Sequence, residues 1–596
     1  MGPWSACVLG GVLAAAACLA SEATAASSDR TLTLVSRGKS SYRIVVPETA
    51  TESEQRAASE LQHFIREVTG AELPIVSDRE RLAPRTILLG RNRHTARLRR
   101  PIDFARLGQE GFTIRTVGNH LVIAGGPANG TLYGVYTFLE EHLGCRWLSS
   151  DVSVIPQRRD LRLAPLDDTQ VPALPVREVY YQDAMDPAFA ARQKLNGNGS
   201  EVRDGRLIRE YHPRWGLWCH TFFNHVPPDR YFATHPEYFS LVDGKRVADG
   251  QLCLTNPDVF RLTVEDLKQR MAAAPEAHYW SVSQNDWARY CQCPECKAID
   301  DREGTPMGSV LTFVNRIAAE FPDKTLSTLA YQYTRRPPKT LRPAKNVLIM
   351  LCSIECNRSR PIQSDPDSAA FRDDVESWAR VCDNVFVWDY VVQFSNLVSP
   401  FPNLRVLQPN VRFFVDNHAK GMFAQGNRER GGEFAELRAY LLAKLLWNPD
   451  CDLNRVMNDF LEGYYGPAAP KIREYIDRMH DALEQSGKTL MIFGGPADHR
   501  DGYLSEERMA IYETLFDEAE RLVQGNADQL LRVQAARLPL MYARLQLGYG
   551  TVAERRKIAE RLFDIAGRTG LLMFNEWNLP TERYRAQVME ALDKAE

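Results

Sequence analysis

Three acidic residues of this sequence, Asp286, Glu355 and Asp389, end or directly follow short apolar runs. Cleavage of a glycosidic bond needs one carboxyl that donates a proton to the leaving oxygen and a second that stabilises or attacks the cationic sugar carbon. We expect Asp286 to be the acid and Glu355 its partner, with Asp389 as a substitute or as a hydrogen-bonding anchor. The alternative for each is a structural carboxylate that caps a helix or pairs with an arginine such as Arg335.

Aromatic and polar side chains gather at the ends of the same runs. Sugar rings stack their C–H faces on aromatic rings, while their hydroxyl groups need hydrogen bonds. The alternative for each aromatic residue is packing of a long loop against the rest of its domain. The residues that we expect to bind substrate are Asn285, His220, Tyr331, Tyr333, Trp388, Tyr390 and Gln425.

A group of three cysteines, Cys291, Cys293 and Cys296, has C-x-C-x-x-C spacing. These thiols offer three soft ligands, and a fourth from Cys352, Cys356 or a nearby histidine would complete a tetrahedral zinc site. A disulfide between two of the three is the alternative. Either role is structural, so we expect neither a catalytic metal nor any other cofactor.

The elements that would position these residues alternate regularly between strand-like and helix-like runs over residues 176–425. Such alternation predicts parallel βαβ units, and the number of runs suits an α/β fold of the (β/α)8 TIM-barrel type. The loops after the strands of such a barrel line its mouth, so the carboxyls and aromatic residues should meet there.

The chain of 596 residues is longer than one hydrophobic core usually supports. We predict a signal peptide over residues 1–25, a small N-terminal α/β domain over 31–165, the barrel over 172–430 and a helical C-terminal region over 431–596. No stretch after the signal peptide is long and apolar enough to span a membrane. We therefore predict a small α/β domain followed by a barrel and a helical region.

The first residues predict export, because residues 6–20 are small or apolar and Ala23-Thr24-Ala25 matches a cleavage pattern. The mature protein should be periplasmic or secreted, with lipid attachment at Cys18 as the alternative. A formal net charge of −3 provides no field that would favour nucleic acid or an anionic membrane. The expected partner is an oligosaccharide or a glycoprotein glycan.

Several strings in the sequence resemble known families. AASELQHFIREVTG and LVIAGGPANGTLYGVYTFLEEHLGCRWL resemble the N-terminal domain that precedes the barrel in α-glucuronidases and β-hexosaminidases. SVSQNDWARYCQCPEC, TLAYQYTRRPPK, NVLIMLCSIEC and VFVWDY resemble the family called domain of unknown function 4838, which overlaps glycoside hydrolase family 163. This resemblance implies an exported glycoside hydrolase with endo-β-N-acetylglucosaminidase-like action on complex N-glycans.

One departure from β-hexosaminidases with a similar domain order concerns the mechanism. Those enzymes place an Asp-Glu pair after the fourth strand, where this sequence has Asn285-Asp286. A neutral Asn285 orients a substrate acetamide weakly, so Glu355 or Asp389 would have to supply the negative charge. Two alternative functions are an α-glucuronidase-like exo-hydrolase, whose closed pocket should contain an arginine or lysine, and a non-catalytic glycan-binding protein.

Overall fold

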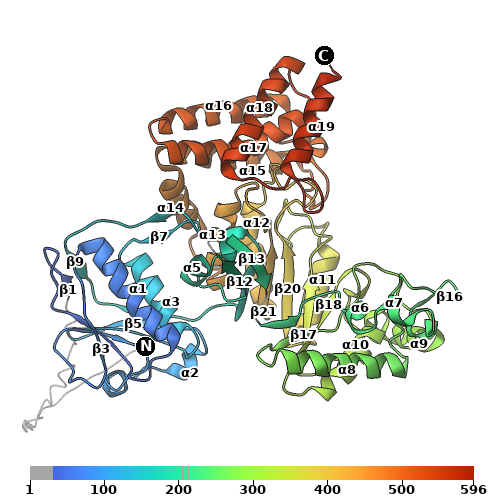
Figure 1. Ribbon diagram of the computed structural model, residues 1–596, viewed down its shortest axis with the longest axis horizontal. Helices are drawn as coiled ribbons and strands as arrows, with labels where there is room; N and C mark the ends of the chain where they lie inside the picture. The colour runs from blue at the N-terminus through green and yellow to red at the C-terminus, as the bar shows by residue number, and fades with distance from the viewer. Residues whose placement is uncertain (1–30, 198, 204–205, 212–213, 596) are drawn as a thin grey trace, which may run out of the picture.

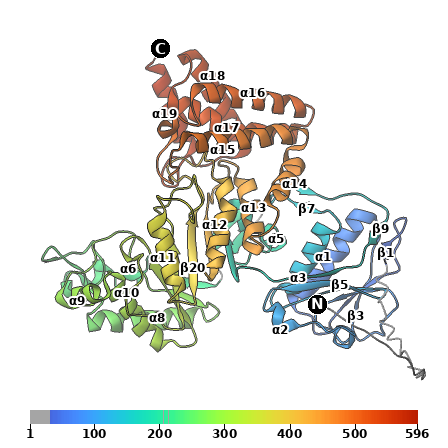
Figure 2. The same cartoon turned by 180° about the vertical axis from the view of Figure 1, so that it is seen from behind.

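The computed structural model describes residues 31–197, 199–203, 206–211 and 214–595. The predicted signal peptide, including Cys18, lies outside the described residues. An N-terminal α/β domain lies to one side of a central curled sheet, and the C-terminal helices lie above that sheet (Figure 1). The same arrangement is seen from behind in Figure 2. Every helix of the described residues is too short or too polar to cross a lipid bilayer.

The N-terminal domain is a six-stranded mixed sheet with helices α1 (Glu52–Thr69) and α3 (Gly130–Glu141) packed against each other. Thr51 and Glu54 form a reciprocal capping box at the start of α1, and Gly70 ends it with φ 76°. The strands in sheet order are β10 (Asp167–Gln170), β5 (Phe112–Val117), β6 (His120–Gly125), β4 (Thr86–Leu89), β2 (Arg43–Val46) and β3 (Ile75–Ser77).

The central sheet is fully parallel and curls into a half-barrel. Its three six-residue strands are buried along their whole length, as is typical of parallel sheets covered on both faces. The strands in sheet order are β11 (Val176–Val179), β21 (Ala419–Gln425), β20 (Val385–Tyr390), β19 (Val347–Cys352), β18 (Thr325–Ala330), β17 (Tyr279–Ser281) and β14 (Trp215–Leu217).

The predicted α/β class is therefore confirmed, with a difference in strand number. The prediction was an eight-stranded barrel, whereas the sheet of the described residues has seven strands. Strands β11 and β14 form its two edges, and no pairing between them closes the ring in the described part of the chain. The segment between them holds the antiparallel pair β12 (Gly199–Arg203) and β13 (Arg206–Tyr211) in place of another sheet strand.

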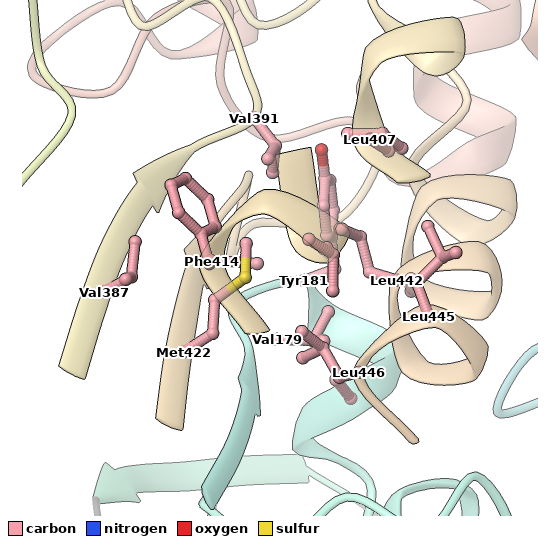
Figure 3. Packing of buried hydrophobic residues seen from close by; sticks show 14 of the residues in the cluster. Val179, Tyr181, Val387, Val391, Leu407, Phe414, Met422, Leu442, Leu445 and Leu446 are labelled. Atoms are coloured by element: carbon pink, nitrogen blue, oxygen red, sulfur yellow. The ribbon is translucent and has the colours of Figure 1, made fainter. Parts of the chain in front are cut away.

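The outer face of this sheet packs on helices α12 (Leu404–Asp416) and α13 (Ala435–Trp447). Figure 3 shows Val387 of β20 and Met422 of β21 beside Phe414 of α12, and Val179 of β11 next to Leu446 of α13. Successive side chains of a strand point to opposite faces. The residues between these outward-facing ones therefore point into the concave face. The other helices of this layer are α8 (Pro257–Ala273), α10 (Met307–Glu320) and α11 (Ala369–Ala379).

The C-terminal region is helical, as predicted, and its loops reach back to the half-barrel. Phe394, after β20, donates its backbone N–H to Ile492 O over 2.9 Å, and Glu576 N donates to Phe394 O over 3.0 Å. These bonds hold two C-terminal loops against the carboxyl ends of the sheet strands. The helices are α14 (Leu453–Tyr465), α15 (Ala469–Ser486), α16 (Glu506–Val523), α17 (Ala527–Leu547), α18 (Val552–Thr569) and α19 (Thr581–Asp593).

A buried ion pair joins the N-terminal domain to the first sheet strand. Arg177 Nη2 of β11 lies 2.6 Å from Glu110 Oε2, and both side chains are almost fully buried. The Arg177 guanidinium also donates to the carbonyl oxygens of Leu174 and Lys194, so each of its three nitrogens has a hydrogen-bond partner. Electrostatic interactions are stronger in the low-dielectric interior than in water, so this pair holds Glu110 against β11.

Candidate functional site

A cavity of about 590 Å³ opens at the carboxyl ends of the half-barrel strands. Its volume lies in the range of small-molecule binding sites. Its walls come from the ends of all seven sheet strands or the segments that follow them, and from two loops of the C-terminal region. The lining residues that matter for chemistry are Tyr180, Trp218, His220, Asp286, Tyr331, Trp388, Tyr390, Phe423, Gln425, Arg428, Glu429, Phe493, Glu576 and Trp577.

The alternation of strand β20 sets the aromatic wall. Phe386, Trp388 and Tyr390 point into the concave face, because Val385 and Val387 pack outward on the helices. The same alternation on β19 presents Cys352 to the cavity. Burial raises the pKa of this thiol well above its ordinary value, so it is a neutral wall residue and not a nucleophile.

Four aromatic rings form a continuous surface at the bottom of the cavity. The rings of Trp218 and Trp388 lie 5.6 Å apart, and Phe423 meets Trp388 edge to face at 5.0 Å. Tyr390 stacks on Trp388 at 6.0 Å. These apolar faces next to polar tips suit a sugar ring, as expected from the sequence.

Asp286 projects into the cavity from the loop after β17, with 61% of its side chain exposed. Tyr331 OH donates to Asp286 Oδ1 over 3.0 Å, and Gln332 Nε2 donates to Tyr331 OH over 3.0 Å. Burial and the nearby Asp286 carboxylate raise the pKa of Tyr331. Tyr331 therefore stays protonated and keeps its role as a donor.

His220, in the segment after β14, faces the same oxygen of Asp286. Its Nδ1 lies 2.8 Å from Gln284 O, and since a carbonyl only accepts, Nδ1 carries a proton. The other ring nitrogen, Nε2, lies 3.8 Å from Asp286 Oδ1. His220 has φ 54°, a left-handed conformation that costs a non-glycine residue on the order of 1–3 kcal/mol. The fold holds His220 in this strained conformation, in which its ring faces the carboxyl.

Glu576 is a second carboxyl in the cavity, and it comes from the loop between α18 and α19. Asn575 shapes this loop, because its Oδ1 accepts backbone N–H groups from Trp577 at 3.1 Å and from Asn578 and Leu579 at 2.9 Å. The turn leaves Glu576 and Trp577 at the cavity mouth.

The hydrogen bonds around Glu576 connect it to the aromatic wall. Trp388 Nε1 donates to Gln425 Oε1 over 2.7 Å, which leaves Gln425 Nε2 to donate to Glu576 Oε1 over 3.0 Å. The pKa of Glu576 is raised, mainly because the surrounding protein desolvates the carboxyl. Arg428 and Gln425 act in the opposite direction, and the charge of Asp286 adds to the increase. A carboxyl with a raised pKa suits a proton donor.

Two predicted carboxyls do not reach this cavity, and this corrects the sequence-based grouping. Glu355 turns to Arg335, whose Nη1 lies 2.9 Å from Glu355 Oε2. Asp389 is buried behind Trp388 on the opposite face of β20, where Ser353 Oγ donates to it over 2.6 Å and Arg358 Nη1 lies at 3.3 Å. Strand alternation is the physical reason for the position of Asp389.

Two predicted substrate-binding residues also lie outside the cavity lining. Asn285 is buried, and its Nδ2 donates to Gly250 O over 3.4 Å, so it has no contact with the cavity. Tyr333 turns away and stacks on Tyr290 at 5.0 Å. The predicted residues that do line the cavity are His220, Asp286, Tyr331, Trp388, Tyr390 and Gln425.

Sequence reasoning missed several residues of this lining, namely Tyr180, Phe423, Arg428, Glu429, Phe493, Glu576 and Trp577. The string NEWN at residues 575–578 carried a signal, because it is a polar and aromatic break in an otherwise helical region. Nothing in the local pattern of this string indicates that it folds back onto the half-barrel.

A second cavity of about 680 Å³ lies between α11 and the loop after β18. It is larger, but of the candidate residues it contains only Tyr333. Its lining includes five basic side chains and a single aromatic ring, so it lacks an aromatic wall. The smaller cavity is therefore the candidate site, because it joins carboxyls and aromatic rings from distant parts of the chain.

The three predicted cysteine ligands gain a fourth neighbour, Cys253, in place of Cys352 or Cys356. The ligand atoms of all four lie within 4.8 Å of one another. Every cysteine of the described residues is a free thiol, so the alternative of a disulfide is not found there.

A family model described as domain of unknown function (DUF4838) matches residues 147–477. The chain belongs to the DUF4838 family. The DUF4838 segment contains the whole half-barrel sheet and Asp286, whereas Glu576 lies beyond it. A second model, described as the N-terminus of glycosyl hydrolase family 67, matches residues 33–138. No curated protein matches the chain.

Solved structures resemble this DUF4838 protein in fold. A family GH115 4-O-methyl-α-glucuronidase with specificity for decorated arabinogalactans has 13% identity and a TM-score of 0.58, over 94% of this chain and 80% of that chain. A GH84 structure has 11% identity and a TM-score of 0.46, over 95% and 94% of the two chains. The first likeness supports the fold alone, and the second is too weak to support an argument.

Proposed function

We propose that this protein is a glycoside hydrolase that uses Glu576 and Asp286 as its two carboxyls. The observation that carries the proposal is that both side chains line one aromatic-walled cavity at the carboxyl ends of parallel strands. The likeness in fold to a GH115 α-glucuronidase and the family 67 N-terminal match agree with this class of reaction.

The roles follow from the surroundings of each carboxyl. Glu576, whose pKa is raised by desolvation, donates a proton to the glycosidic oxygen. Asp286 accepts the hydroxyl hydrogen bond of Tyr331, which suits an ionised carboxylate that attacks the sugar or activates water. This proposal moves the acid role from Asp286, where the sequence suggested it, to Glu576.

The finer prediction of endo-β-N-acetylglucosaminidase action on N-glycans lacks support in this geometry. An acetamide-assisted mechanism needs a side chain that orients the acetamide from the cavity wall. Asn285, at the expected position, is buried and bonded to Gly250 O. The two-carboxyl mechanism does not need this contact.

A second candidate, an exo-hydrolase of uronic acid glycosides, is favoured by Arg428 in the cavity lining. A planar guanidinium binds carboxylates through paired hydrogen bonds, so it can select a uronate over a neutral sugar. Arg428 lies near Tyr180, with Nη1 3.4 Å from Tyr180 OH, and its charge acts on Glu576.

The test is incubation of the full chain with α- and β-linked aryl glucuronides, glucosides and N-acetylglucosaminides, with decorated arabinogalactan, and with complex N-glycans. Release of reducing ends that both Glu576→Gln and Asp286→Asn abolish would support the hydrolase. Binding of a glycan without turnover would instead support the non-catalytic alternative. A wild-type preference for glucuronides that Arg428→Met removes would support the uronate candidate.

A further inference from the structure

Two segments from either side of helix α8 meet beside the candidate site. The first includes the hairpin β15 (Leu241–Val242) and β16 (Lys245–Arg246) and ends at Cys253. The second runs from Asp286 into helix α9 (Pro294–Glu303). Figure 1 and Figure 2 both show α9 at the end of the molecule opposite the N-terminal domain.

Four thiols meet where these segments touch. Cys253 comes from the first segment, and Cys291, Cys293 and Cys296 come from the second. All four residues are buried, and their sulfur atoms lie within 4.8 Å of one another. Four buried thiols this close together have no ordinary packing role that requires cysteine at every position.

The sulfur spacing fits a tetrahedral ion better than a disulfide. Zinc–sulfur bonds of about 2.3 Å place the sulfurs of a tetrahedral site about 3.8 Å apart. Cys253 Sγ and Cys293 Sγ are 3.7 Å apart. A disulfide would need about 2.05 Å, and the four cysteines are free thiols.

The surroundings provide hydrogen-bond donors for thiolate sulfurs. Leu241 N donates to Cys291 Sγ over 3.3 Å, and Arg246 Nη1 lies 3.7 Å from the same sulfur. Thr255 Oγ1 lies 3.3 Å from Cys296 Sγ. Such donors orient metal-bound thiolates and offset their charge.

We propose that Cys253, Cys291, Cys293 and Cys296 bind one zinc ion in a closed structural site. Four sulfur ligands fill a tetrahedral coordination shell, so the ion has no position for substrate or water. Its role is to join the two segments next to the loop that carries Asp286. This inference concerns metal binding and does not depend on the proposed hydrolase activity.

Gln251 extends the connection from this cluster to the Asp286 loop. Its Oε1 accepts from Asn285 N over 2.9 Å, and its Nε2 donates to Asn285 O over 3.2 Å and to Trp287 O over 2.5 Å. Gln251 lies two residues before Cys253, so an ion held by Cys253 also fixes the segment that holds both neighbours of Asp286.

The decisive measurement is the metal content of the full chain, purified from zinc-supplemented cells, by inductively coupled plasma mass spectrometry. We expect about one zinc per chain, as one tetrahedral site requires. Cys253→Ser and Cys293→Ser should lose it, while Cys382→Ser, which removes a buried free thiol elsewhere, should retain it. Wild-type protein with no zinc, with iron instead, or with a disulfide in the cluster would overturn the proposal.

A second measurement avoids variants that fail to fold. Removal of the metal from wild-type protein with a mercurial reagent should release zinc to a colorimetric chelator. Amide hydrogen exchange should then accelerate over residues 239–253 and 284–296 but not over β19 (Val347–Cys352). Unchanged exchange in both segments would overturn the proposed role of the ion in holding the Asp286 loop.

Discussion

Gln425 Nε2 donates a hydrogen bond of 3.0 Å to Glu576 Oε1, although the two residues lie 151 positions apart in the sequence. Gln425 ends the sheet strand β21, and Glu576 belongs to a loop between two C-terminal helices. The helical region therefore completes the cavity that the half-barrel begins. This region supplies Glu576, one of the two carboxyls proposed for catalysis.

Replacing either of these two carboxyls should remove most of the hydrolytic activity. We expect Asp286→Asn and Glu576→Gln each to lower kcat/KM by roughly 10²–10⁴-fold, the usual contribution of acid–base groups. Glu355→Gln is the matched control, because Glu355 pairs with Arg335 outside the cavity lining. Steady-state kinetics on the substrate that the wild type cleaves fastest give kcat/KM for all three variants. Loss of activity in the Glu355 variant with retention in the Glu576 variant would contradict the assignment.

The pH dependence should report the surroundings of Glu576. A general acid works only when protonated, so kcat/KM should fall as the pH rises through the pKa of Glu576, which is raised. Gln425 donates to the ionised form and lowers this pKa. Gln425→Leu should therefore raise the pKa further and move the alkaline limb to higher pH.

The control for this shift is Gln524→Leu, at an exposed position after helix α16. Its pH–rate profile should match that of the wild type. An alkaline limb that moves to lower pH in Gln425→Leu would contradict the role of Glu576 as the acid.

Two exposed aromatic rings at the cavity mouth should bind substrate. Trp577 is 56% exposed and stacks on Phe493, which is 48% exposed, with ring centres 6.3 Å apart. Trp577→Ala should raise KM by roughly 5–30-fold, a loss of about 1–2 kcal/mol, with kcat nearly unchanged. Leu522→Ala, at another exposed apolar position, should leave both constants unchanged. A fall in kcat alone would argue against a simple binding role.

Asp389 should matter for stability. Its carboxylate pairs with Arg358 and accepts from Ser353 in the interior. Asp389→Ala leaves the buried Arg358 charge without its partner and should cost about 3–5 kcal/mol of unfolding free energy. Glu355→Ala breaks a partly exposed pair and should cost no more than about 1 kcal/mol. Urea unfolding, followed by intrinsic fluorescence, measures the unfolding free energy of both variants. Equal midpoints for the two variants would contradict this distinction.

The sequence determined the order and type of the elements and part of the site. Periodicity along the chain reflects which side of each element is buried, so it predicted the α/β domain, the parallel sheet and the helical region. Strand ends were recognisable, which is why Asp286, Trp388 and Tyr390 were found. Strand alternation places Asp389 on the opposite face of β20 from Trp388 and Tyr390. This position could have been deduced from the sequence.

Which residues meet in space depends on how distant segments pack. Cys253 joins the cysteines after Asp286, and Glu576 joins the cavity, through packing of segments that are far apart in the chain. The number of strands in the sheet also depends on this packing, because β11 and β14 remain the two edges of the described sheet. Local patterns follow from neighbours within one element, whereas these contacts depend on how whole elements pack, which no local period encodes.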